Sequence, residues 1–260
     1  MTRQIRVGNV LIGGGAPVVI QSMLNTKTTD VEGSLSQIRA LASAGCQIAR
    51  LAVPNMEAVR TFAEICKESP LPLVADIHFD YKLAIAAAEG GASKIRINPG
   101  NIGGEDRVKA VVDVCKERNI PIRIGVNGGS LDKRLLEKYG HPTAEALVES
   151  AFEHLELLEK QGFYDTCVSM KSSTVPTMVA AARLFRSKCD YPLHIGVTET
   201  GPVKMGLMKS AMGIGALLLD GIGDTIRVSL TADPVEEVYC AKQILHACGL
   251  AENTPELISC

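Results

Sequence analysis

Short apolar runs alternate with longer amphipathic segments along almost the whole chain. Between the runs, segments such as VEGSLSQIRALASAG place Leu35, Ile38 and Leu41 on one helical face, and Gly45 follows as the expected C-terminal cap. Eight of the apolar runs have the length and composition of buried strands: residues 17–23, 47–53, 71–78, 94–100, 121–127, 166–172, 192–199 and 225–231. This alternation predicts parallel strands joined by crossover helices.

The number of strand–helix units predicts an α/β fold of the (β/α)₈ TIM-barrel type, which typically takes about 250 residues. A doubly wound open sheet is the rival, but its dinucleotide form needs a G-x-G-x-x-G turn where this chain has QSMLNTKTTD. Ahead of the first strand, QIRVGNVLIGGG predicts a small hairpin that plugs the barrel floor. The long gap between the fifth and sixth strands predicts an extra helix, SLDKRLLEKYG. We expect residues 1–250 to form one domain.

Composition adds few constraints. The chain has 46% hydrophobic and 22% charged residues and a net charge of −2, so it offers no general attraction for nucleic acid or an anionic membrane. Its start, MTRQIRVGN, lacks the apolar segment of a secretory signal, and its longest apolar run, IGALLL, is too short to span a bilayer. The eight cysteines include no C-x-x-C pair, which favours reduced core thiols. We therefore expect a cytoplasmic protein.

Charged side chains recur near the carboxyl ends of the predicted strands, where ligands of TIM barrels bind. Buried charges are costly, so their number needs an explanation. A single arginine in a strand is usually part of a structural ion pair, but here five cations face two acids, Asp76 and Glu199. The five cations are Arg50, Arg96, Arg123, Lys171 and Arg227. The surplus predicts a bound anion, and the planar guanidinium groups and the glycine loops beyond the strands suit phosphate or diphosphate.

Two residues at the same mouth are candidates for proton transfer. His78 is either a general acid–base group or simply a hydrogen-bonded residue of the mouth, and Asp76 with His78 lacks the third ligand that a metal site needs. Glu199, among so many cations, should be ionised at rest, and it is the catalytic candidate that orients a substrate hydroxyl or returns a proton.

Seven motifs carry a family resemblance. In order they are RLAVPN, DIHFDY, KIRINPGNIG, IRIGVNGGSL, SMKSS, GVTETG and GDTIRVSLT. Together they resemble the barrel of the bacterial 4-hydroxy-3-methylbut-2-enyl diphosphate synthases, over essentially the whole chain. The resemblance implies a barrel similar to that of dihydropteroate synthase. It also implies an oxidoreductase of non-mevalonate isoprenoid (terpenoid) biosynthesis that acts on a CH or CH₂ group by reductive ring opening of 2-C-methyl-D-erythritol 2,4-cyclodiphosphate.

The resemblance also implies roles for individual residues. The family's barrel glutamate corresponds to Glu199. Its diphosphate contacts correspond to Arg50, His78, Arg96, Asn98, Arg123, Asn127, Lys171 and Ser229, to which the charge pattern adds Arg227. Family members hold a [4Fe–4S] cluster on three cysteines and a glutamate in a second domain, and Cys260 resembles the first of these ligands. A single thiol cannot hold a cluster. We therefore expect residues 251–260 to begin a linker to a cluster domain that this chain lacks.

The resemblance implies further partners: flavodoxin or ferredoxin as the electron donor, and a homodimer in which the cluster domain of one subunit caps the barrel of the other. A chain without that domain should bind the substrate but be inactive alone. Two alternatives stay open, namely a pterin-binding transferase barrel of the dihydropteroate synthase type and a non-catalytic, truncated binding module. Specific binding of a reduced pterin would favour the first alternative.

Overall fold

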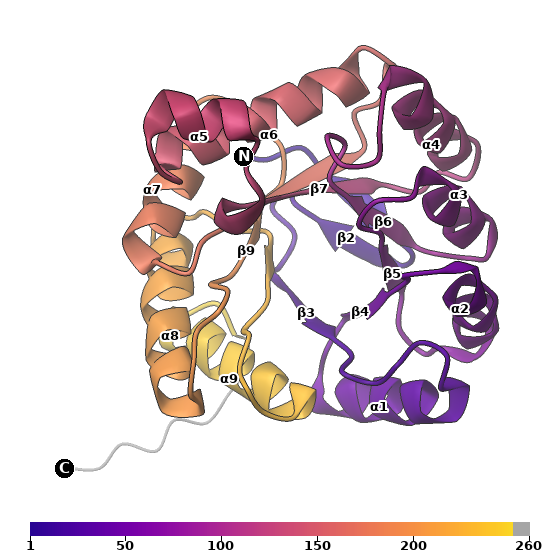
Figure 1. Ribbon diagram of the computed structural model, residues 1–260. Helices are drawn as coiled ribbons and strands as arrows, with labels where there is room; N and C mark the ends of the chain where they lie inside the picture. The colour runs from indigo at the N-terminus through magenta and orange to yellow at the C-terminus, as the bar shows by residue number, and fades with distance from the viewer. Residues whose placement is uncertain (252–260) are drawn as a thin grey trace.

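The computed structural model describes residues 1–251, and its centre is a parallel eight-stranded barrel (Figure 1). The strands are β3 (Val19–Met23), β4 (Ile48–Ala52), β5 (Leu73–Asp76), β6 (Lys94–Ile97), β7 (Ile122–Asn127), β8 (Thr166–Lys171), β9 (His194–Ile195) and β10 (Thr225–Ile226). Their spatial order is β8-β7-β6-β5-β4-β3-β10-β9. A bridge between Val168 and Leu193, with Val168 N–H donating to the Pro192 carbonyl at 2.9 Å, joins β8 to β9 and closes the ring. The predicted TIM barrel is confirmed.

Helices surround the strands on the outside of the barrel (Figure 1). They are α1 (Val31–Ala44), α2 (Met56–Glu68), α3 (Tyr81–Glu89), α4 (Glu105–Glu117), α5 (Lys133–Tyr139), α6 (Ala144–Glu159), α7 (Val175–Arg186), α8 (Val203–Leu219) and α9 (Pro234–Ala247). Helix α1 illustrates how sequence sets the bounds. The Asp30 carboxylate accepts the Gly33 N–H at its start, and Gly45, at φ 97°, ends it in the left-handed conformation that glycine adopts readily.

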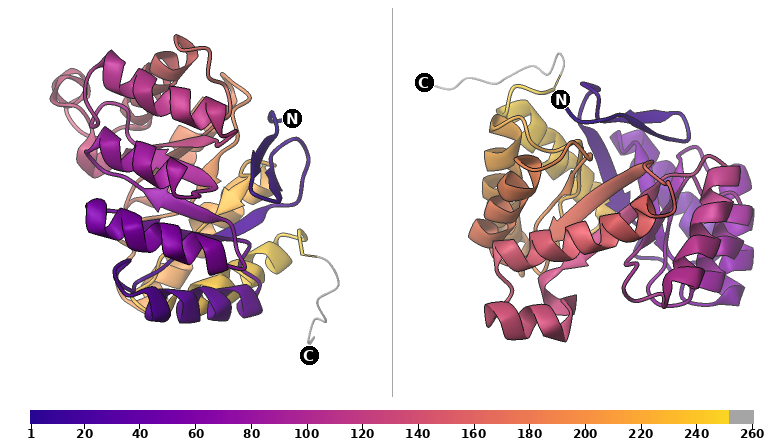
Figure 2. Two further views of the ribbon diagram at one scale, coloured as in Figure 1. Left: turned by 90° about the vertical axis from the view of Figure 1, so that its right-hand side faces the viewer. Right: turned by 90° about the horizontal axis from the view of Figure 1, so that it is seen from above.

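The N-terminal hairpin closes one end of the barrel. Strands β1 (Ile5–Val7) and β2 (Val10–Ile12) pair antiparallel, and Figure 2 shows this indigo hairpin lying across the end at which the barrel strands begin. Its buried side chains form a separate apolar cluster with the first inward-facing residues of the strands. The cluster comprises Ile5, Val7, Ile12, Val19, Ile48, Val74 and Cys167. The predicted plug is confirmed, and ligands are left with the opposite, carboxyl end of the strands.

The segment between β7 and α6 carries the predicted extra helix, α5, preceded by a 3₁₀ turn (Gly128–Ser130). The last two strands are much shorter than their apolar runs suggested. Beyond Ile195 and Ile226 the ladder is reduced to single hydrogen bonds, such as Arg227 N–H to the Ile195 carbonyl at 3.1 Å. Because single hydrogen bonds replace a continuous ladder after β9 and β10, the chain can leave the strand direction there and form the mouth of the barrel.

Strand register brings charged side chains from neighbouring strands to one level inside the barrel. Arg96 on β6 pairs with Asp76 on β5 and with Arg123 on β7, while Met23 on β3 pairs with Arg50 on β4. Successive side chains of a strand point to opposite faces, so every second residue of a strand faces the inside of the barrel. The charged residues and Met23 occupy such inward positions. The apolar residues between them face the helices and belong to the main core.

Candidate active site

A cavity of about 220 Å³ lies at the carboxyl ends of the strands, inside the ring of charges. Its lining comes from β3–β8 and from the segments after β5, β9 and β10. The lining residues are Met23, Arg50, Asp76, His78, Arg96, Arg123, Asn127, Ser169, Lys171, Thr198 and Arg227. All five cations that were expected to share one mouth therefore do so, together with His78 and Asn127.

Asp76 is the centre of one ionic cluster. Arg96 Nη1 lies 3.0 Å from its Oδ1, and Arg50 Nε and His78 Nε2 each lie 3.6 Å from its Oδ2. Burial alone would raise the pKa of Asp76, but Arg50, the His78 hydrogen bond and Arg96 outweigh burial and hold the pKa well below its usual range. Asp76 is therefore a permanent anion that fixes the guanidinium groups of Arg50 and Arg96.

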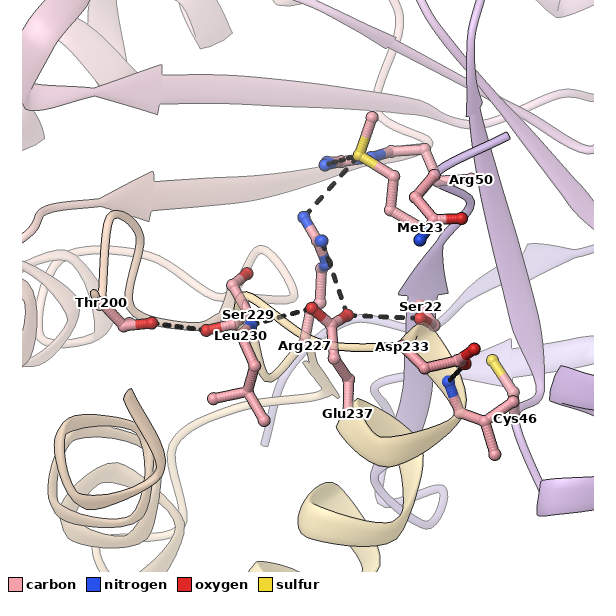
Figure 3. A network of polar contacts seen from close by, with 12 residues as sticks. Ser22, Met23, Cys46, Arg50, Thr200, Arg227, Ser229, Leu230, Asp233 and Glu237 are labelled. Atoms are coloured by element: carbon pink, nitrogen blue, oxygen red, sulfur yellow. Dashed lines mark hydrogen bonds and ion pairs between the residues drawn. The ribbon is translucent and has the colours of Figure 1, made fainter. Parts of the chain in front are cut away.

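Glu237, at the start of α9, is the centre of a second cluster (Figure 3). Its Oε2 lies 3.5 Å from Arg227 Nη2 and accepts the Ser22 hydroxyl at 3.4 Å, while its Oε1 accepts the Leu230 N–H at 2.8 Å. Burial raises the pKa of Glu237 against the opposing effect of Arg227. The thioether of Met23 lies between the clusters, 2.7 Å from Arg50 Nη2 and 3.7 Å from Arg227 Nη1.

Glu237 replaces Glu199 as the second acid of the ring, and this corrects the sequence-based expectation. The sequence predicted Glu199 among the cations because it is the last residue of a predicted strand, but its side chain is exposed and it does not line the cationic cavity. The carboxylate that pairs with Arg227 comes instead from a helix. Its signal in the sequence was weak, because Glu237 belongs to an ordinary amphipathic segment, PVEEVYC.

Arg123 and Lys171 have no carboxylate partner in the described part of the chain. Nε and Nη1 of Arg123 are buried without a hydrogen-bond acceptor, and burial, reinforced by Arg96, lowers the pKa of Arg123 to about 10. Burial, followed by the charges of Arg227, Arg50, Arg123 and Arg96, lowers the pKa of Lys171 well below its ordinary value. Five basic side chains and the two carboxylates that contact them leave a formal surplus of three positive charges around the cavity.

Three predicted residues lie outside this cavity. Asn98 turns its side-chain oxygen to the Gly100 N–H at 3.1 Å and lines a different cavity, beside His154. The Ser229 hydroxyl is buried without a partner, while its carbonyl accepts from Thr200 (Figure 3). Glu199 lines a larger cavity of about 640 Å³ that adjoins the cationic one and shares Asn127, Lys171 and Thr198 with it.

The sequence analysis also missed polar residues deeper in the barrel. Lys94 is fully buried, its Nζ has no partner, and burial lowers its pKa to about 8. His194 is equally buried, and burial followed by the charge of Arg123 lowers its pKa well below the usual value. Lys94 could have been found, because it lies two positions before Arg96 and so shares its face.

The described residues do not fit an iron–sulfur cluster. No group of three or more His, Cys, Asp or Glu side chains in residues 1–251 is arranged to hold a metal, and the seven cysteines in this range are all free thiols. Cys260, the expected first cluster ligand, lies outside the described residues. Within the same range, no helix has the length and apolar composition needed to cross a membrane.

Solved structures support the fold. Dihydropteroate synthase from Stenotrophomonas maltophilia superposes with a TM-score of 0.67 at 14% identity, over 97% of this chain and all of that one. An N-acetylneuraminic acid synthetase from Leptospira borgpetersenii gives a TM-score of 0.66 at 15% identity, over 98% and 93% of the two chains. At this identity the likeness is one of architecture alone.

Sequence comparisons are far more specific. The 4-hydroxy-3-methylbut-2-en-1-yl diphosphate synthase (flavodoxin) of Maridesulfovibrio salexigens is 57% identical over 259 residues, which is 100% of this chain and 72% of that protein. The enzyme of the same name from Geobacter sulfurreducens is 56% identical over 259 residues and 73% of its length. The model of the GcpE TIM-barrel domain matches residues 2–242. As the seven motifs predicted, the chain belongs to the GcpE family and forms its TIM-barrel domain.

Proposed function

We propose that the chain is the substrate-binding barrel of a 4-hydroxy-3-methylbut-2-en-1-yl diphosphate synthase and binds 2-C-methyl-D-erythritol 2,4-cyclodiphosphate for reductive ring opening. The observation that carries the proposal is the surplus of three positive charges around one small cavity. Removing such groups from water costs free energy, and an anion that completes their pairing offsets this cost. A cyclic diphosphate supplies two negative charges and acceptor oxygens on several sides, which suits guanidinium groups arranged around a ring.

Residue roles follow from the arrangement of charges. Asp76 and Glu237 orient Arg50, Arg96 and Arg227, so these cations are held in place before the ligand arrives. Arg123 and Lys171, which lack carboxylate partners, provide the attraction that is not already satisfied. His78, Asn98, Asn127 and Ser229 are assigned to the diphosphate by resemblance.

Glu199 is proposed to act on the carbon part of the ligand. It lies at the edge of the larger cavity and has a left-handed backbone, with φ 53°. This conformation costs a non-glycine residue energy and is often found at functional sites. From there its carboxylate can hold a substrate hydroxyl or return a proton, and the diphosphate lies on the other side of Lys171.

The electrons for the reaction come from outside the described residues. We propose that they pass through a [4Fe–4S] cluster in a further domain that begins near residues 251–260, with flavodoxin or ferredoxin as donor. Both relatives described above carry flavodoxin in their names, and each is longer than this chain. On this proposal the isolated chain, a cytoplasmic protein, binds the substrate without turning it over.

A homodimer belongs to the same proposal, and one surface supports it. Met205, Met208, Met212 and Leu219 are exposed and recur along one face of α8. Exposed apolar stripes of this kind are typical of protein–protein interfaces. Analytical sedimentation measures the oligomeric state of the chain, and Met208→Glu, which places a charge on this face, should disrupt the dimer.

Calorimetric titration with the cyclodiphosphate tests the function. We expect saturable binding that inorganic diphosphate competes away and that weakens by roughly 2–5 kcal/mol in Arg96→Ala. Arg39→Ala, which removes an exposed cation of α1, is the matched control and should bind normally. Absence of heat together with absence of competition would defeat the proposal. Binding of a reduced pterin in the same cavity would favour a transferase instead.

A further inference from the structure

Two cavities of different chemistry meet at the mouth of the barrel. The smaller is lined by four arginines, and the larger contains Glu199 and no arginine. Three residues line both cavities: Asn127 at the end of β7, Lys171 at the end of β8, and Thr198 three residues after β9. A molecule that contacts both the arginines and Glu199 therefore passes these three side chains.

The larger cavity is suited to a hydroxyl-bearing carbon chain. Its walls carry the hydroxyl groups of Ser172, Ser173, Thr174 and Thr177. Three of these groups already bond to one another: the Ser172 and Thr174 oxygens lie 3.3 Å apart, and Thr174 donates to Thr177 at 2.8 Å. The hydroxyl groups of this wall can donate to and accept from the hydroxyl groups of a ligand.

Thr198 differs from the other hydroxyl residues in position and in bonding. Its backbone N–H donates to the Ser172 carbonyl at 3.3 Å, and the Thr200 hydroxyl donates to the Ser229 carbonyl at 2.6 Å, so the backbone is held on both sides of Thr198. Its side chain is partly buried, and in the described part of the chain its hydroxyl has no hydrogen-bond partner. An uncommitted donor and acceptor is thus fixed at the junction of the two cavities.

We infer that Thr198 is a specificity-determining residue whose hydroxyl bonds a carbon-borne hydroxyl of a ligand that has its phosphoryl groups among the arginines. The inference rests on the proposed function and extends it. It explains how a barrel that attracts any compact phosphate ester can prefer a polyol phosphate. The arginines bind the phosphoryl groups, and Thr198 and the larger cavity favour a ligand whose carbon chain carries hydroxyl groups.

The test compares two ligands in two variants. Thr198→Val keeps the shape of the side chain and removes the hydroxyl, whereas Thr198→Ser keeps the hydroxyl. We expect Thr198→Val to weaken binding of the cyclodiphosphate about three- to tenfold, as for one lost hydrogen bond, while inorganic diphosphate binds within about twofold of the unmodified chain. Thr198→Ser should retain the preference. Thr61→Val, the same chemical change on α2, is the control for both ligands.

The outcomes separate the two proposals. If the unmodified chain binds inorganic diphosphate but not the cyclodiphosphate, the proposed function itself is wrong. If it binds both, and Thr198→Val weakens both equally or neither, the role of Thr198 is wrong and the proposed function stands. Thermal unfolding of each variant shows whether its fold is intact. If the valine variant does not fold, Thr198→Ser still tests the inference, because this variant keeps the hydroxyl and should keep the preference for the cyclodiphosphate.

Discussion

Replacing Arg123 by methionine should make the protein more stable and abolish most of its affinity for diphosphate. Arg123 is 1% exposed, and two of its guanidinium nitrogens have no acceptor. Methionine is of comparable length, flexible and apolar, so it can fill the space without a buried charge. Buried charges that lack a partner are among the groups whose replacement by apolar residues stabilises a fold.

The pKa of Arg123 gives the size of the effect. Burial lowers it from its ordinary value to about 10, so protonated Arg123 is less favourable in the folded than in the unfolded chain. At about 1.4 kcal/mol per pKa unit, the folded state is destabilised by about 3 kcal/mol. The group is charged in both states at neutral pH, so this cost is fully present below pH 10 and fades only as the pH rises toward the ordinary pKa of arginine. Arg123→Met should recover up to about that amount in the free energy of unfolding.

Urea denaturation with and without ligand is the assay. The unmodified chain in excess inorganic diphosphate, at about one hundred times Kd, should gain about 2.7 kcal/mol in the free energy of unfolding, and Arg123→Met should gain almost nothing. Arg96→Met is the matched control: it removes the 3.0 Å bond to Asp76 and should destabilise the ligand-free chain by about 2 kcal/mol. An Arg123→Met variant that is less stable than the unmodified chain, or that binds diphosphate normally, would refute the reasoning.

Two further predictions concern neighbouring residues. Burial and the surrounding arginines lower the pKa of Lys171 in the free protein, and an anion beside it should raise that pKa again. Ligand binding should therefore take up protons, and the affinity should fall by at most about tenfold per pH unit as the pH rises between the pKa values of the free and the bound protein. Calorimetry in buffers of different ionisation enthalpy measures the proton uptake, and Lys171→Arg should abolish it. Release of protons on binding would contradict the prediction. Gly125→Ala places a Cβ 2.4 Å from Arg96 Nε and should weaken diphosphate binding by displacing that side chain, whereas Gly215→Ala, whose Cβ meets only Cys248 Sγ at 3.9 Å, should bind normally.

The periodicity of the sequence was sufficient to predict the barrel. Buried apolar runs at regular intervals, each followed by an amphipathic segment, permit few architectures other than parallel strands with external helices. The same periodicity identified the cations, because Arg50, Arg96 and Arg123 each lie between two apolar residues that face the helices. Element ends were less certain: the two-residue strands β9 and β10 depend on how the closed barrel distributes its hydrogen bonds, which no local pattern encodes.

The pairing of the charges could not be predicted, because it depends on contacts between distant segments. Glu237 lies ten residues after Arg227 and reaches it only because α9 starts beside the mouth. Ordinary turn chemistry after β10 brings this about, with the Asp233 carboxylate accepting the Val235 N–H at 2.8 Å to start the helix. Asn98 shows the opposite case: it follows its strand in the expected phase, yet an available N–H at Gly100 draws its side chain into another cavity.

The charge surplus at the mouth does not depend on which acid pairs with Arg227 or on where Asn98 lies. Four of the five cations occupy inward positions on strands and Arg227 directly follows β10, so the strand pattern sets the number of cations at the mouth. Acidic side chains can come from strands, loops or helices, but burying a carboxylate at the mouth costs desolvation free energy. Such burial is therefore favourable only beside a cation. The carboxylate that pairs with Arg227 is that of Glu237, so the balance of five cations and two acids is the same, although Glu199, which lines the larger cavity, is not one of the two acids.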